Sequence, residues 1–101
     1  MSVTKSFTAI AINGIAGFEI IVKGDANVGK LQVMPELEKA VPQGTNPAYL
    51  LLNLLNASDA TPETFQKVQY NEKIVSQDTY QTVDIFFKGQ KVETLPVKKG
   101  N

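Results

Sequence analysis

The sequence predicts an α+β domain in which a mainly antiparallel sheet packs against one central helix. A leucine-rich apolar stretch lies in the middle of the chain, and segments that alternate apolar and polar residues precede and follow it. Such an order is typical of α+β domains, where helices gather on one side of an antiparallel sheet. A β-sandwich with an embedded helix is the alternative interpretation.

The central helix is expected over about residues 47–57. Thr45 or Asn46 can cap its first turn, and Pro47 fits the first helical position, where a missing N–H is tolerated. Leucine and alanine favour a helical interior, and Pro62 follows a polar stretch that ends it. Apolar residues occupy most of the circumference, which predicts a helix largely inside the domain.

The segments around this stretch predict strands. Residues 4–12 and 18–23 alternate, and the glycine-containing loop between them predicts a hairpin. Residues 66–75 favour a strand, although helical spacing also fits. Residues 79–88 and 91–97 predict a second hairpin, with apolar residues on one face of the first strand and Asp84 on its exposed face.

Shorter elements and a frayed C-terminal tail complete the expected structure. They are a third strand over 30–34, one or two helical turns over 36–41, a brief helical turn from 62 and a tail over 98–101. No linker or repeat divides the chain, so one globular domain over 1–101 is expected.

The composition narrows the possible chemistry. The ten basic residues, all lysine, balance ten acidic residues, and the chain contains no histidine and no cysteine. This excludes a histidine base and cysteine-based metal or thiol chemistry, so we expect no enzyme, no cofactor and no metal site. The N-terminus lacks a secretory pattern, and we expect a cytoplasmic protein, or one incorporated into a virion or other assembly, without a membrane partner.

One motif resembles the phosphate-binding first loop of small GTPases. Gly24, Gly29 and Lys30 have the spacing G-x-x-x-x-G-K after an apolar strand. The resemblance implies backbone N–H groups around phosphates, with the lysine on the outer phosphates. Leu31 stands where that chemistry requires a Ser or Thr hydroxyl on magnesium, so nucleotide or small-ligand binding is kept as an alternative only.

Two surfaces are candidates for binding. Amide and tyrosine side chains are frequent at protein interfaces, and the predicted protein-interaction residues are Gln69, Tyr70, Asn71, Gln77, Tyr80 and Gln81. Lysines concentrate near the C-terminus and predict an alternative nucleic-acid site at Lys88, Lys91, Lys98 and Lys99.

The sequence therefore favours a small non-catalytic interaction or structural protein that binds a protein partner or itself. A virion or assembly component of a phage or another mobile element is the preferred form of this hypothesis. An inhibitor of a host factor and a nucleic-acid-binding module are the alternatives.

Overall fold

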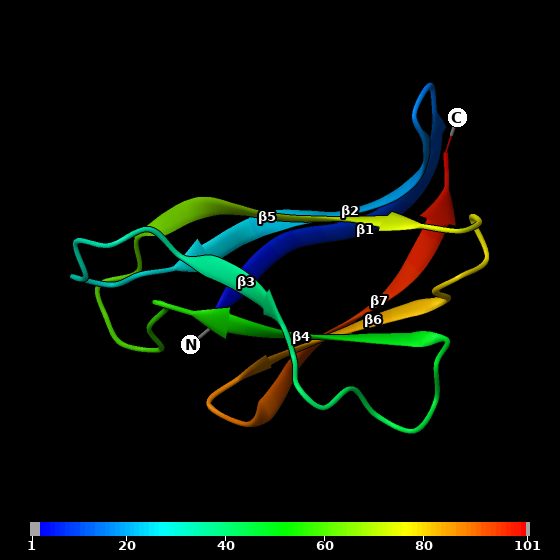
Figure 1. Ribbon diagram of the computed structural model, residues 1–101. Coiled ribbons are helices and arrows are strands. Elements are labelled where there is room, and N and C mark those ends of the chain that lie inside the picture. Colours follow the sequence, from blue (N-terminus) through cyan, green and yellow to red (C-terminus); the bar gives the residue numbers. More distant parts are fainter. Residues whose placement is uncertain (1–2, 101) are drawn as a thin grey trace.

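The computed structural model describes residues 3–100, which form seven strands and no helix (Figure 1). The strands are β1 (Thr4–Gly14), β2 (Gly17–Asn27), β3 (Glu36–Lys39), β4 (Tyr49–Leu55), β5 (Phe65–Ile74), β6 (Thr82–Phe87) and β7 (Gln90–Lys99). The prediction of an α+β domain with a central helix is therefore wrong, because the described chain is all-β.

The seven strands form one sheet that rolls into a nearly closed, flattened barrel. Its hydrogen-bonded order is β3-β4-β6-β7-β1-β2-β5. β1 pairs with β7 and β4 with β6 in parallel, and the other neighbouring pairs are antiparallel. Figure 1 shows β1, β2 and β5 as one layer above β3, β4, β6 and β7. The edge strands β3 and β5 contact each other and form the seam of the barrel.

The segment expected as the central helix is the strand β4. Leu50, Leu52 and Leu54 are 0%, 0% and 3% exposed, whereas the alternate side chains point to the outer side. This burial repeats every two residues, as in a strand, rather than every 3.6. β4 pairs with β3 on one side and β6 on the other, and these backbone hydrogen bonds override the helix propensity of leucine.

The capping signal before this segment forms a turn rather than a helix. The Asn46 side-chain oxygen accepts a hydrogen bond from the Ala48 N–H at 3.0 Å, and the Asn46 carbonyl accepts one from the Tyr49 N–H at 3.1 Å. An asparagine that bonds to a backbone N–H two residues on is a common turn. The Asn46 hydrogen bond that could cap a helix therefore forms a turn before the strand β4.

Three shorter predictions are also wrong. The described chain has no helical turn at 36–41 or from 62, and no strand over 30–34. β3 occupies part of the first of these segments, because Glu36 and Glu38 alternate with the more buried Leu37 and Lys39. An isolated helical turn gains few hydrogen bonds for the backbone freedom it loses, and strand pairing with β4 supplies more.

Asp84 is buried, which contradicts the expectation that it is exposed. Its side chain accepts a hydrogen bond from the Thr94 hydroxyl at 3.0 Å and lies 3.8 Å from the Lys91 amine. These partners come from the neighbouring strand β7 and offset the cost of removing a carboxylate from water.

Both predicted hairpins and the strand over 66–75 are confirmed. β1 and β2 join through the two-residue turn Ile15-Ala16. β6 and β7 join through the turn Lys88-Gly89, in which both residues have a positive φ. Val83, Ile85 and Phe87 share the buried face as predicted. Of the expected frayed tail, Lys98 and Lys99 belong to β7, and residue 101 lies outside the described residues.

Candidate protein-interaction faces

The outer side of the β1-β2-β5 layer has an apolar centre. Ala9 and Ala11 of β1 point into the core, so Ile10 and Ile12 between them point outward. Ile21 of β2 lies directly opposite Ile10 in the register of the two strands. The three isoleucines are partly exposed, and Gly100 packs against two of them.

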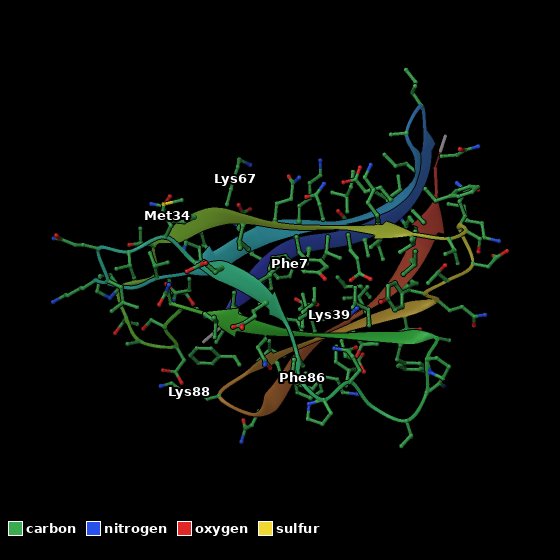
Figure 2. The ribbon with its side chains drawn as sticks, in the orientation of Figure 1. Phe7, Met34, Lys39, Lys67, Phe86 and Lys88 are labelled. Carbon is green, nitrogen blue, oxygen red and sulfur yellow. The ribbon has the colours of Figure 1, made fainter. Side chains whose placement is uncertain are left out.

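Polar groups surround these isoleucines. On β5, the Gln69 amide donates to Asn71 at 2.7 Å, and the Asn71 amide donates to Glu19 of β2 at 3.0 Å. Five lysines occupy outward positions on this side, against Glu19 and Asp25, which gives a net charge of +3: Lys5, Lys23, Lys67, Lys73 and Lys98. We call this side, with its isoleucines, the lysine face; Figure 2 shows Lys67 on it.

The lysine face is hollowed beside a β-bulge. Ser6, with a φ of 58°, belongs to the irregularity in β1 where the register with β2 shifts. A shallow hollow of about 600 Å³ lies there, lined in part by Thr8, Lys23, Lys67 and Gln69. At the other end of this face the β1–β2 hairpin bends outward (Figure 1), and Ile15 at its tip is fully exposed.

The outer side of the β3-β4-β6 layer has the opposite charge. Glu36, Glu38 and Asp84 stand against Lys91, a net charge of −2. Four apolar or aromatic side chains share this side: Tyr49, Leu51, Leu55 and Phe86. We call it the acidic face; Figure 2 shows Phe86 on the outside of this layer.

A second hollow, of about 380 Å³, lies at one end of the acidic face. The loop over 43–47 forms one wall and Tyr49 and Tyr80 form the other. The Gln43 side chain fixes this loop, because its amide accepts from the Leu51 N–H at 2.9 Å and donates to the Leu51 carbonyl at 2.8 Å. The Gln43 amide thus continues the backbone hydrogen bonding along β4 and fixes the position of the loop over 43–47.

A polar network occupies the seam between β3 and β5. Lys39 donates to Glu72 at 3.2 Å and to the Tyr80 hydroxyl at 3.1 Å. Glu72 also accepts from the hydroxyls of Tyr70 at 2.6 Å and Tyr80 at 2.7 Å. Figure 2 shows Lys39 directed into the space between the layers. We call these four residues the seam network.

The seam network shifts the ionisation of its members. Partial burial raises the pKa of Glu72, but the hydrogen bonds from Tyr70, Tyr80 and Lys39 outweigh burial and lower it overall. Burial and the hydrogen bond to Glu72 raise the pKa of both tyrosines. The hydrogen bond to Tyr80 and the charge of Glu72 raise the pKa of Lys39 despite its desolvation. The Glu72 carboxylate and its hydrogen-bond donors therefore connect β3 to β5 across the seam.

The six predicted protein-interaction residues lie in different places. Gln69 and Asn71 are on the lysine face, whereas Tyr70 and Tyr80 belong to the seam network. The Gln77 amide donates to the carbonyls of Ala11 and Gly100, which ties the β5–β6 turn to β1 and the chain end. Gln81 is exposed just before β6.

The four lysines predicted as a nucleic-acid site do not come together. Lys88 lies in the β6–β7 turn over the Phe87 ring, and Lys91 is paired with Asp84. Lys98 and Lys99 lie at the other end of β7, where Lys99 pairs with Asp78. Four of the five lysines on the lysine face were missed, because only the strand register shows that they share a side.

The structure divides the G-x-x-x-x-G-K motif between the end of β2, which holds residues 24–27, and a turn that holds Gly29 and Lys30. Gly24 lies in β2 opposite Val68 of β5, and Gly29, at a φ of 56°, packs against Ser58. The motif includes the buried Asn27, whose side-chain oxygen accepts from the N–H groups of Gly29 and Thr64 at 2.9 and 3.0 Å. The extended chain of β2 and the Gly29 N–H bound to Asn27 differ from a loop of N–H groups curled around a phosphate. Lys30 is exposed.

No protein family model matches the chain, and neither the curated proteins nor the solved structures compared with it give a match. Among residues 3–100, no helix has the length and apolar character needed to cross a membrane. Within the same residues, no group of three or more acidic side chains is placed to hold a metal ion.

Proposed function

We propose that this protein acts without catalysis, as a structural or adaptor subunit that binds another protein through its lysine face. The observation that carries the proposal is the isoleucine cluster on the outer side of a sheet, where alternation normally places polar residues. An apolar centre with a polar, hydrogen-bonding rim is the usual anatomy of a protein interface.

The polar residues around the isoleucines can orient a bound partner, and they also keep this surface soluble. The Gln69 and Asn71 amides are exposed and can bond to an approaching backbone. The net charge of +3 favours a partner surface with acidic groups, because complementary charge speeds association and selects the partner. The hollow beside Ser6 and Lys23 offers a place for one protruding side chain.

Site-specific photo-crosslinking tests the proposal in the cells that make the protein. A photoreactive residue in place of Gln69 should give one defined protein adduct, identified by mass spectrometry. The matched control places the same residue at Gln90, which is exposed at the β6–β7 turn away from the lysine face. An adduct of equal yield from both positions, or from neither, would contradict the proposal.

The adduct also separates the two forms of the hypothesis. Adducts between copies of this chain, or with a protein of a virion or similar assembly, support an assembly component. An adduct with a host enzyme in a small complex of fixed stoichiometry supports an inhibitor. The variant Ile21→Lys should abolish either adduct, whereas Gln90→Lys, which adds the same charge at the exposed β6–β7 turn away from the lysine face, should not.

Nucleic-acid binding is the second candidate, because five lysines share one face. It predicts oligonucleotide binding that weakens steeply with salt. Combined replacement of Lys23, Lys67 and Lys73 by alanine should remove this binding, whereas replacement of Lys88 and Lys91 should not. Absence of binding at low salt would end this candidate.

A further inference from the structure

We propose that copies of this chain associate head to tail, with Ile15 of one copy seated in the Tyr49–Tyr80 hollow of the next. The lysine face of each copy then faces the acidic face of its neighbour. This inference rests on the proposed function and names its partner as a second copy. Three independent features support it, namely an apolar knob, a hollow that fits it and opposite charges on the two faces.

The knob is Ile15. Its side chain is fully exposed at the tip of a two-residue hairpin turn. Turns are usually rich in glycine and in small polar residues that interact well with water, and the positive φ of this hairpin falls on Gly17 rather than on Ile15. A β-branched apolar residue gains nothing there in the isolated chain, but it gains free energy when a partner removes it from water.

The hollow offers an apolar receptor. Pro47, Tyr49 and Tyr80 contribute rings to its walls, and its volume of about 380 Å³ admits a branched side chain. The hollow is open to solvent like the one on the lysine face, so it suits one protruding side chain rather than an enclosed ligand. The Gln43 bonds to Leu51 hold one wall, and the Tyr80 bond to Glu72 holds the other. The receptor is therefore formed before a partner arrives.

Knob and hollow lie at the same end of the molecule but on opposite sides. In Figure 1 the β1–β2 tip rises above the upper layer, and the loop before β4 hangs below the lower layer at that end. A shift along the direction in which the layers stack brings the tip of one copy beneath the loop of another. Such a contact joins two different surfaces and continues into a ring or a filament.

Charge selects this arrangement over a symmetric one. Contact between two lysine faces would place +3 against +3, whereas head-to-tail contact places +3 against −2. Like charges across an interface are unfavourable and opposite charges steer association. Association should therefore weaken as salt rises.

Sedimentation velocity over a concentration series at low salt tests the proposal. The wild type should form species larger than a dimer. Ile15→Asp and Thr45→Arg, which places a charge at the rim of the hollow, should both be monomeric. Val75→Ser is the matched control, because Val75 is also an exposed apolar residue in a turn, and it should associate like the wild type. Circular dichroism confirms that each variant is folded.

Mixing the two monomeric variants gives the sharpest result. Thr45→Arg keeps an intact knob and Ile15→Asp keeps an intact hollow, so together they should form a one-to-one dimer that does not grow. A monomeric mixture, or wild-type association unaffected by Ile15→Asp, would overturn the inference. If the wild type stays monomeric while the Gln69 crosslinker captures another protein, the proposed function stands and this inference fails.

Discussion

At the scale of single residues, Gly24 shows how a motif and its structural role can differ. Its spacing to Gly29 and Lys30 resembles a phosphate-binding loop, yet in the fold Gly24 makes room for Phe7. A Cβ added to Gly24 would lie 1.4 Å from Phe7 Cδ1, so the ring occupies the space of the missing side chain. Figure 2 shows Phe7 between the layers.

Gly24→Ala should destabilise the fold by about 1–3 kcal/mol, because the added methyl group must displace a buried ring. Alanine in an unobstructed strand position would be favourable, since glycine loses more backbone freedom on folding. Gly14→Ala is the control, because its Cβ would meet only the Gly17 carbonyl at 3.6 Å; it should change stability by about 0.5 kcal/mol or less. Urea unfolding measures both, and equal costs would contradict the packing role of Gly24.

At the scale of elements, β4 shows what the sequence could and could not predict. Its leucines identify a buried element correctly, but six apolar residues out of seven fit a helix and a strand equally well. The hairpins were predictable because their turns and alternation are local signals. The choice for β4 depends on its pairing with β3, across the preceding loop, and with β6, which is far along the chain. The helix and strand propensities of the β4 residues contain no information about these partners.

The same reason limits prediction of the interaction faces. The exposed positions of Gln69 and Asn71 were predictable because both are amides in an alternating strand, and their role in binding stays a prediction. Lys23 and Lys73 lie 50 positions apart in the chain, and only the pairing of β2 with β5 places them on one side. Ile15 lies in the predicted loop between the first two strands, and an isoleucine at a hairpin tip is itself a local signal of an exposed apolar residue.

Leucine substitutions in β4 distinguish the strand from a helix. Leu52→Ala should cost about 2–5 kcal/mol, because Leu52 is 0% exposed. Leu55→Ala should cost about 1 kcal/mol or less, because Leu55 is 38% exposed on the acidic face. The helix interpretation places Leu55 in the core. Thermal and urea unfolding measure both, and a large cost for Leu55→Ala would contradict the register of β4.

At the scale of the whole molecule, the seam is where the barrel closes without a continuous ladder. β3 has four residues and β5 has ten, so most of the edge of β5 has no strand beside it. Lys39, on the shorter strand, reaches Glu72 on the longer one. The free energy that holds the barrel closed at the seam should therefore depend on the ionisation of Lys39, Glu72 and the two tyrosines bound to Glu72.

Acid should weaken the fold through Glu72. Its folded-state pKa is below the ordinary 4.5, so the unfolded chain binds a proton more readily. The contribution of Glu72 is present above pH 4.5 and is lost as the pH falls through the folded-state value. Glu72→Gln should flatten the decline in unfolding free energy that sets in as the pH falls below 4.5. If the unfolding free energy of Glu72→Gln declines in acid as steeply as that of the wild type, Glu72 does not stabilise the seam.

Base should weaken the same seam through the tyrosines and Lys39. The folded-state pKa of Tyr80 is raised above 10.0, so its contribution is complete below pH 10.0 and declines as the pH rises through the folded-state value. Lys39 behaves in the same way above its ordinary 10.5. Tyr80→Phe should reduce the alkaline loss of stability, whereas Tyr49→Phe, outside the seam network, should leave it unchanged.

Hydrogen exchange should reveal the seam as the place where the barrel opens. β3 pairs only with β4, whereas β6 has a hydrogen-bonded strand on each side, so amides over 36–39 should exchange faster than those of β6 at neutral pH. Glu72→Gln removes the charge that Lys39 binds and should accelerate exchange in β3 further, with little change in β6. Glu19→Gln is the matched control, because it alters a carboxylate on the lysine face away from the seam. Exchange in β3 as slow as in β6, or equal acceleration by both variants, would show that closure depends on other contacts.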